Sequence, residues 1–319
     1  MPSSNRRPVV LVTEPMSPRS LEYLKLHAEV RHAPKEQAAE AVADADALVV
    51  RTYTQVNEAL LAKAGRLKVV ARAGVALENI DVAACRAHGV EVVHTPAANT
   101  LAVVDYTIGA IVMLNRRYWP ITSPLSDKDF HEARNQMFGR FLADMTLGIV
   151  GLGRIGSRVG RAAAALGMKV LYNDILDIKT DYPATAVDKD TLYAQSDLVT
   201  IHVPVTKLTE KMINAATLAK FKQGAQFINA ARGQCVNYHD LADAIRSGRI
   251  SGAVIDCHDP EPPPADYPMY AVAGENVILT PHVAARVPAA MERMSDVVYD
   301  VIAVLEGKTP QYPAPQETD

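Results

Sequence analysis

The amino-acid sequence predicts an α/β protein with two parallel-sheet domains, one doubly wound and one assembled from two separate parts of the chain. Short apolar runs typical of buried parallel strands alternate with helical segments along most of the chain. A glycine-rich turn at residues 151–156 follows the first strand of the second series, and nearly half of the 319 residues precede it. Those earlier residues are therefore expected to form a sheet of their own.

The first hundred residues are expected to contain the smaller sheet. Ser17 and Pro18 have the residue types of a helix N-cap and of the first helical position, so a helix is expected to follow. Another helix is expected from Asn57 to Lys63. Four strands are expected, at residues 8–13, 46–50, 67–71 and 90–93.

The doubly wound domain is expected to begin with a long apolar helix over residues 99–116. Further along, Asn237 and Asp240 are typical of a helix start, and Gly248 is typical of its end. Six strands, with helices between most of them, are expected at residues 146–150, 169–173, 197–202, 225–229, 253–255 and 277–279.

The last helix is expected to return to the first sheet, because the second sheet is complete before it begins. It starts at Pro288 and ends at Gly307. Its apolar side chains fall on one stripe: Met291, Met294, Val298, Val301, Ile302 and Leu305. The predicted domains are therefore residues 1–98 with 288–319, and residues 99–287.

Composition limits the classes of partner. The formal net charge is −3, with 22% charged residues, which gives no reason to expect a nucleic acid or an anionic membrane. The apolar stretch Leu101–Leu114 contains Asp105 and is too short to span a bilayer, and the N-terminus has no signal-peptide core. The three cysteines lack metal-ligand spacing, so we expect a reduced, cytoplasmic protein without a metal.

The glycine-rich turn has the pattern that cradles a dinucleotide. Gly151 allows the tight turn, Gly153 lets the backbone approach a pyrophosphate, and Gly156 lets the next helix pack against the strand. Asp174 follows the next strand, at the spacing where an acid binds the adenosine ribose hydroxyls of NAD and repels a 2′-phosphate. A plain turn aspartate is the alternative interpretation of Asp174.

Three side chains with anion-binding or acid–base chemistry follow later strands. Arg232, Glu261 and His282 are expected at the carboxyl ends of their strands, where open α/β sheets place active sites. Singly they could be a solvated arginine, a loop glutamate and a core histidine. Together they suit the reduction of a 2-oxo acid, because arginine binds a carboxylate and histidine transfers a proton. A glutamate on the other ring nitrogen favours the imidazolium.

With these residues in place, the chain resembles the D-isomer-specific 2-hydroxyacid dehydrogenase family over nearly its whole length. The resemblance implies a Rossmann NAD domain with a discontinuous, flavodoxin-like substrate (lid) domain. It also implies reversible NAD-dependent hydride transfer between a small D-2-hydroxy acid and its 2-oxo acid, and a homodimer. The motifs that carry it, in order, are Arg72–Asp81, Thr146–Gly156, His202–Pro204, Asn229–Gly233, Asp256–Pro262 and Thr280–His282.

The resemblance also implies roles for single residues. It makes the arginine, the glutamate and the histidine named above the catalytic set. It assigns the substrate carboxylate to backbone N–H groups around Val75 and Ala76, with Asn99 nearby. Besides the three glycines, it places at the cofactor Arg154, Ile155, Asp174, His202, Val203, Pro204, Ala230, Ala231, Asp256 and Ala285.

Some positions depart from the usual pattern of the family. Ala76 stands where glycine is common, and its methyl group is expected to narrow the substrate pocket. Val104 and Asp105 replace a frequent Ala-Glu pair. Cys257 and His258 replace a frequent apolar–aromatic pair beside the glutamate, and we interpret His258 as a packing substitution rather than a second titrating group.

Two alternative functions remain open from the sequence. Arg51 ends a strand of the first sheet, and in phosphoglycerate-using relatives a similar arginine meets the substrate phosphate, although a surface arginine explains it too. The chain could therefore be a D-3-phosphoglycerate dehydrogenase. It could also be a catalytically weak NAD-sensing interaction protein that keeps the cofactor site and regulates partner binding.

Overall fold

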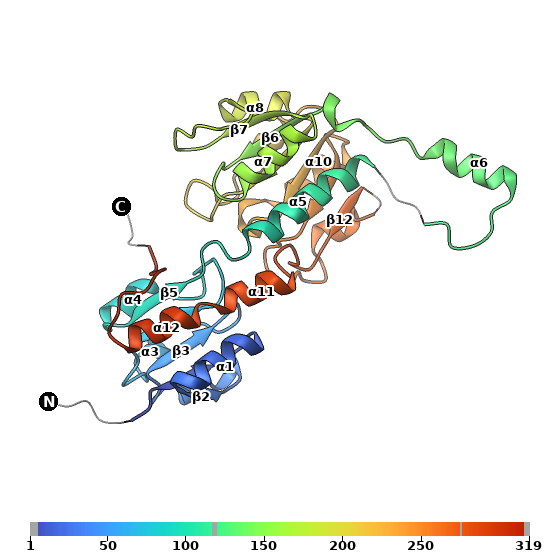
Figure 1. The fold of residues 1–319 in the computed structure, drawn as a ribbon. Helices are drawn as coiled ribbons and strands as arrows, with labels where there is room; N and C mark the ends of the chain where they lie inside the picture. The colour runs from blue at the N-terminus through green and yellow to red at the C-terminus, as the bar shows by residue number, and fades with distance from the viewer. Residues whose placement is uncertain (1–5, 117–119, 275, 316–319) are drawn as a thin grey trace. The chain divides into compact units, whose positions relative to one another are not determined.

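In the computed structural model the chain forms two compact units: unit 1 is Met1–Asn99 with Ala285–Asp319, and unit 2 is Thr100–Ala284 (Figure 1). The structure describes residues 6–116, 120–274 and 276–315. Residues 1–5, part of the N-terminal segment in which the sequence shows no signal-peptide core, lie outside the described residues. The second crossing between the units falls at residues 284–285, whereas the sequence placed it before residue 288. Within the described ranges, no helix is long and apolar enough to cross a membrane.

Unit 1 contains a five-stranded parallel sheet, one strand more than predicted. The missed strand is β2, whose sequence Glu-Val-Arg-His is partly exposed and has no apolar run. The strand order β2-β1-β3-β4-β5 is the flavodoxin-like order, as predicted. The strands are β1 Val9–Val12, β2 Glu29–His32, β3 Ala47–Val50, β4 Val69–Arg72 and β5 Glu91–His94.

Helices cover both faces of the sheet in unit 1. Ser17 caps α1 with its side chain, as the sequence predicted. The single final helix that was expected is two helices, because a turn at residues 296–297 interrupts it, and Val298 and Val301 of α12 are buried against the sheet. The helices are α1 Pro18–His27, η1 Lys35–Gln37, α2 Ala38–Ala41, α3 Glu58–Leu61, α4 Val82–Ala87, α11 Pro288–Ser295 and α12 Val298–Leu305.

Unit 2 contains a parallel sheet in the order β12-β11-β10-β9-β6-β7-β8. Six of its strands were predicted, and the seventh, β8, is a two-residue edge strand too short to show an apolar pattern. The strands are β6 Thr146–Val150, β7 Lys169–Asn173, β8 Thr185–Ala186, β9 Leu198–Ile201, β10 Ala225–Asn229, β11 Ile250–Ile255 and β12 Val277–Leu279.

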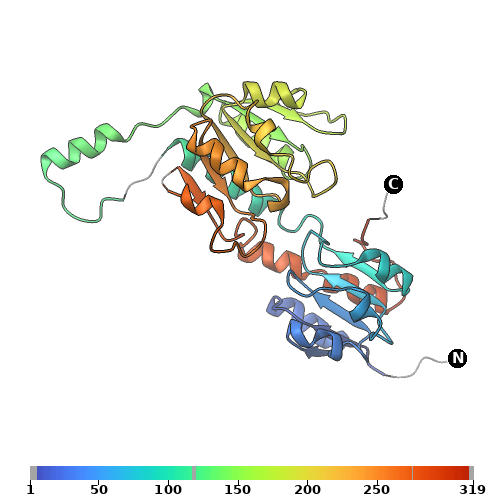
Figure 2. The same cartoon turned by 180° about the vertical axis from the view of Figure 1, so that it is seen from behind.

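Helices also cover both faces of this second sheet (Figure 2). Helices α5 and α7 pack on one face, and α8, α9 and α10 pack on the other. The sequence missed α6, which buries no residue and so has no apolar stripe. The helices are α5 Thr100–Asn115, α6 Asp127–Gln136, η2 Leu142–Asp144, α7 Gly156–Ala165, α8 Lys189–Gln195, α9 Ala215–Leu218, η3 Gly233–Cys235, α10 Tyr238–Arg246 and η4 Pro268–Ala271.

The strand order of unit 2 reverses at β6. The chain proceeds from β6 to β7 and β8 on one side, and then returns to β9 on the other side. In a doubly wound sheet, ligands bind outside the carboxyl ends of the strands at such a reversal. The doubly wound fold predicted from the sequence is confirmed. A ligand-binding site is therefore expected at the loops after β6, β7, β9 and β10.

Candidate active site

The structure brings Glu261 and His282 together beyond the carboxyl ends of the neighbouring strands β11 and β12. Arg232 follows β10, the next strand in the sheet. Cys257 connects these segments, because its Sγ lies 3.3 Å from the carbonyl oxygen of Ala231 and 3.9 Å from Nε2 of His282. The three residues expected from separate parts of the sequence therefore share one edge of one sheet.

The imidazole of His282 is oriented by Glu261. Its Nδ1 donates to Oε2 of Glu261 at 2.8 Å, and the other carboxylate oxygen accepts the backbone N–H of His258 at 2.8 Å. Because Nδ1 is engaged, Nε2 is the ring nitrogen that remains to exchange a proton with a substrate. The pair is partly open to solvent, with 44% of the His282 side chain and 36% of the Glu261 side chain exposed.

The charge state of the pair follows from these contacts. The Cys257 sulfur facing Nε2 and the Glu261 carboxylate on Nδ1 raise the pKa of His282 from 6.5 to about 10. Burial opposes ionisation of Glu261, but hydrogen bonds from His282 and from the His258 backbone outweigh it and lower its pKa. Near neutral pH the arrangement is an imidazolium held by a carboxylate, which is a proton donor.

Asp256 holds the loop that carries His282. Its carboxylate is completely buried and accepts the hydroxyl of Thr280 at 2.6 Å and the backbone N–H groups of Val283 and Ala284 at 2.8 and 2.9 Å. His282 itself has a left-handed backbone with φ of 54°, which is uncommon for a side chain that is not glycine. The sequence had placed Asp256 at the cofactor, and that contact stays a prediction beside this observed role.

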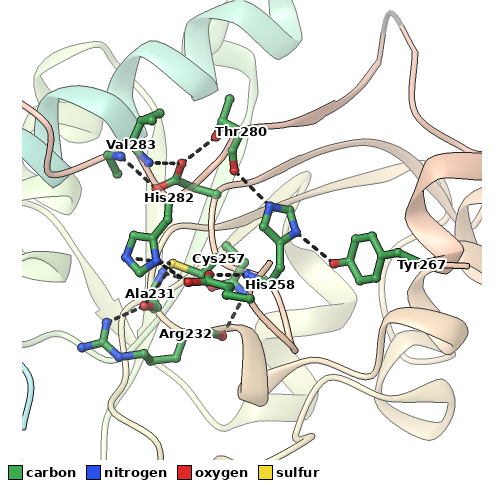
Figure 3. A network of polar contacts seen from close by, with 12 residues as sticks. Ala231, Arg232, Cys257, His258, Tyr267, Thr280, His282 and Val283 are labelled. Atoms are coloured by element: carbon green, nitrogen blue, oxygen red, sulfur yellow. Dashed lines mark hydrogen bonds and ion pairs between the residues drawn. The ribbon is translucent and has the colours of Figure 1, made fainter. Parts of the chain in front are cut away.

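His258 is a buried connector. Only 5% of it is exposed, its Nδ1 lies 3.0 Å from the hydroxyl of Tyr267, and its Nε2 lies 2.9 Å from the carbonyl oxygen of Thr280 (Figure 3). The ring thus connects the Glu261 loop to Tyr267, directly before η4, and to Thr280, directly after β12. These contacts agree with the interpretation of His258 as a packing residue.

The Arg232 segment lies tightly against the Glu261 loop. The side chain of Asn229 donates to the carbonyl oxygen of Arg232 at 2.9 Å, and the Arg232 guanidinium donates to the carbonyl oxygen of Ala231 at 2.6 Å. A Cβ at Gly233 would lie 1.8 Å from the carbonyl oxygen of His258, so only glycine fits there. This close approach explains why a glycine directly follows the arginine.

The glycine turn after β6 has room for a phosphate group. Gly151 has φ of +92°, and a Cβ there would lie 2.7 Å from the carbonyl oxygen of His202. A Cβ at Gly156 would lie 2.1 Å from the carbonyl oxygen of Gly151, so the first turn of α7 packs directly on the strand end. At Gly153, by contrast, a Cβ would meet no atom of the described chain within 4 Å. That open space suits a ligand that approaches the backbone.

The neighbouring strand ends supply the rest of the cradle. The carboxylate of Asp174, after β7, accepts the backbone N–H groups of Leu152 at 2.6 Å and Leu176 at 3.0 Å, so it lies beside the glycine turn. Burial lowers the pKa of His202, after β9, to about 4, and its buried Nδ1 has no hydrogen-bond partner within the described ranges. An unpaired buried nitrogen of this kind is suited to a bound ligand.

The other residues expected at the cofactor surround the same edge of unit 2. Arg154 and Ile155 form the turn before α7, Val203 and Pro204 follow β9, and Ala230 and Ala231 follow β10. Ala285 is different, because it lies just inside unit 1. The glycine turn, Asp174 and His202 together fit a dinucleotide.

The residues expected to bind substrate belong to unit 1. Val75 and Ala76 follow β4, and Asn99 is the last residue before the crossing into unit 2. Arg51 follows β3, and its guanidinium donates to the carbonyl oxygen of Pro15 at 3.2 Å and lies 3.2 Å from the sulfur of Met291.

Sequence reasoning missed Glu14, which shapes the loop after β3. Its carboxylate accepts the backbone N–H groups of Arg51, Thr52, Tyr53 and Thr54 at 3.0 to 3.2 Å. Burial opposes ionisation, but these hydrogen bonds lower the pKa of Glu14. No signal in the sequence indicated it, because the contacts join residues far apart along the chain.

Comparison with known families gives a match over most of unit 2. Residues 108–284 match the family model described as D-isomer specific 2-hydroxyacid dehydrogenase, NAD binding domain. The chain is 32% identical to a hydroxypyruvate reductase of Thermotoga maritima, over 89% of this chain and 94% of the relative. It is 34% identical to a glyoxylate reductase of Thermofilum pendens, over 95% of this chain and 93% of the relative.

Two further similarities are informative. The chain is 34% identical to a D-3-phosphoglycerate dehydrogenase of Archaeoglobus fulgidus, over 93% of this chain but only 57% of that relative. Its fold is similar to the crystal structure of a D-lactate dehydrogenase of Aquifex aeolicus complexed with NAD and lactic acid. That similarity has a TM-score of 0.80 and 28% identity, and covers 94% and 96% of the two chains.

Proposed function

This chain belongs to the D-isomer-specific 2-hydroxyacid dehydrogenase family, and from that premise we propose that Arg232, Glu261 and His282 are its catalytic residues. The protein is an NAD-dependent oxidoreductase that acts on the CH–OH group of small 2-hydroxy acids and reduces the corresponding 2-oxo acids. The observation that carries the assignment is the 2.8 Å contact between His282 Nδ1 and Glu261, at the same sheet edge as the glycine turn.

Each of the three side chains has a distinct task in this proposal. The guanidinium of Arg232 binds the substrate carboxylate through paired hydrogen bonds and polarises the adjacent carbonyl. Nε2 of His282 donates a proton to the carbonyl oxygen in reduction and accepts it in oxidation. Glu261 keeps the ring oriented and stabilises the imidazolium. NADH, when bound, supplies the hydride for the carbonyl carbon.

Unit 2 is proposed as the NAD-binding domain and unit 1 as the substrate domain. The cofactor set of Asp174, His202 and the glycine turn supports the first assignment, since it lies within unit 2. Backbone N–H groups of Val75 and Ala76 would bind the substrate carboxylate.

For the substrate, we favour a small, uncharged side chain on the 2-oxo acid, as in glyoxylate and hydroxypyruvate. Two similar proteins are named as reductases of these acids, and the methyl group of Ala76 is expected to narrow the substrate pocket. The phosphoglycerate alternative needs Arg51 to bind a phosphate. In unit 1 the guanidinium of Arg51 instead donates to the carbonyl oxygen of Pro15. The negatively charged carboxylate of Glu14 accepts the backbone N–H of the same arginine.

A panel of 2-oxo acids with NADH tests these assignments. Glyoxylate and hydroxypyruvate should be reduced with the highest kcat/KM, and His282→Ala should lower kcat by about 10²- to 10⁴-fold while NADH still binds. Arg232→Ala should raise the KM for the oxo acid as well. Preferred oxidation of 3-phosphoglycerate, lost in Arg51→Ala, would favour the alternative. Tight NADH binding without turnover on any acid would indicate an NAD-sensing interaction protein.

The proposed assembly is a homodimer formed through the segment around α6. Phe138 and Phe141 are 86% and 74% exposed, and Phe130 of α6 is 46% exposed. A monomer would leave this apolar group in water. Sedimentation should show a dimer that Phe138→Ser with Phe141→Ser dissociates, whereas Leu26→Ser, at an equally exposed position, leaves it intact. A monomeric parent protein would refute the assembly.

A cytoplasmic location is also proposed. Its support is that Cys85, Cys235 and Cys257 are all buried and free, which suits a reducing compartment. Cell fractionation with an antibody against the chain tests it, and recovery of the protein outside the cytoplasmic fraction would contradict it.

A further inference from the structure

Cys257 and His282 together have the geometry of a soft-metal site. The thiol sulfur lies 3.9 Å from Nε2 of His282, the ring nitrogen that Glu261 leaves available. A zinc ion with bonds of about 2.3 Å to sulfur and about 2.0–2.1 Å to nitrogen, at a tetrahedral angle, holds these two atoms about 3.5 Å apart. The observed separation therefore needs only a small closing movement to chelate the ion.

Glu261 completes the arrangement as the outer partner of the histidine. A histidine that binds a metal through one nitrogen commonly donates its other N–H to a carboxylate, which fixes the ring and raises its basicity. Nδ1 of His282 already makes this contact at 2.8 Å. Ligand atoms of Cys257, Glu261 and His282 all lie within 4.8 Å of one another.

The ion can reach this position from solvent, although the cysteine is buried. Only 1% of Cys257 is exposed, whereas 44% of the His282 side chain is exposed. Solvent therefore contacts His282 of this pair rather than Cys257. Thiolate and imidazole together prefer Zn²⁺ and related soft ions over Mg²⁺ or Ca²⁺. Binding releases the thiol proton and the Nε2 proton, so charge and protons balance.

We propose that Cys257 Sγ and His282 Nε2 form an inhibitory binding site for Zn²⁺. The ion takes the nitrogen that must donate a proton to the substrate, so it blocks reduction directly. Water fills its other coordination positions. The inference rests on the geometry of the two side chains, and on the proposed function only for the inhibitory consequence.

Binding is tested without activity, by titrating the full-length protein with Cd²⁺ and following the ultraviolet thiolate-to-metal charge-transfer absorption. One equivalent should produce the band in the parent protein and in Cys85→Ala, which removes another buried cysteine. The band should be absent in Cys257→Val and in Cys257→Ser, of which the second preserves the size of the side chain. An equal band in either Cys257 variant would overturn the site.

Inhibition is tested separately on the NADH-dependent reaction. Zn²⁺ should inhibit the parent protein competitively with the 2-oxo acid, and each variant is compared with its own metal-free rate. The inhibition constant should rise at least about tenfold in Cys257→Ser, because one of the two protein ligands is lost. Equal inhibition of the parent and Cys257→Ser would overturn the inhibitory role. A protein that binds Cd²⁺ but reduces no 2-oxo acid would instead contradict the proposed function.

Discussion

Replacement of Glu261 by glutamine tests the central contact of the site. The amide keeps the size of the side chain and can still accept a hydrogen bond from His282 Nδ1, but it removes the negative charge 2.8 Å away. Hydrogen bonds to charged groups contribute about 1.5–3 kcal/mol to stability. More than a third of each side chain is exposed, 44% of His282 and 36% of Glu261, so solvent screening reduces this interaction energy to about 1.4 kcal/mol. That energy corresponds to about one pKa unit.

The sign of the change follows from the charge of the partner. In the parent protein the pKa of His282 is raised to about 10, so the imidazolium is lost only as the pH rises through that value. Without the carboxylate the pKa falls, and the proton donor is lost at a lower pH. The alkaline limb of kcat/KM for oxo-acid reduction should therefore move down by about one pH unit. Oxidation of the hydroxy acid needs the neutral imidazole, so the increase of its kcat/KM with pH should also move to lower pH.

The assay follows NADH consumption against pH in the presence of a metal chelator, so that no ion occupies the Cys257–His282 pair. Glu306→Gln is the control, because it removes one exposed carboxylate that lies in unit 1. Its profile should overlay that of the parent protein. An alkaline limb at the same pH in Glu261→Gln and in the parent protein would refute the proposed electrostatic role of Glu261.

Three other predictions concern the cradle and its support. Gly153→Ala should fold normally but bind NADH at least about tenfold more weakly, because its methyl group enters the open space proposed for the cofactor. Gly156→Ala should instead lower the Tm, because its Cβ would lie 2.1 Å from the carbonyl oxygen of Gly151. Asp174→Ala should reduce the preference for NADH over NADPH in kcat/KM, and an unchanged ratio contradicts its ribose role. His258→Phe should lower the free energy of unfolding in urea by about 1–3 kcal/mol, because it removes the hydrogen bonds of His258 to the Tyr267 hydroxyl and to the Thr280 carbonyl oxygen.

The sequence predicted the strands that show apolar runs and missed the elements that do not. β2 is polar and partly exposed, β8 has two residues, and α6 buries nothing, so none of them has a hydrophobic pattern. Hydrophobic periodicity reports burial, and these elements are held by strand pairing or by local capping instead. Ser126, for example, starts α6 by accepting the backbone N–H of Asp129.

The proximity of Glu261 and His282, and the place of Arg232, were predictable for a topological reason. Parallel strands end at a common edge, so residues that follow neighbouring strands converge whatever their separation along the chain. Hydrogen-bond partners do not follow from that rule. The sequence did not reveal that Asp256 holds the His282 loop, or that Glu14 binds four consecutive backbone N–H groups.

The sequence by itself determined the fold class, the dinucleotide turn and the chemical types at the strand ends, because each depends on local residue patterns and strand polarity. Only the tertiary structure decided which atoms face one another. In the sequence Cys257 only replaces a frequent apolar residue of the family, yet its sulfur lies 3.9 Å from Nε2 of His282, the proposed proton donor. Strand register and loop packing set that distance, and these depend on contacts between residues far apart in the chain.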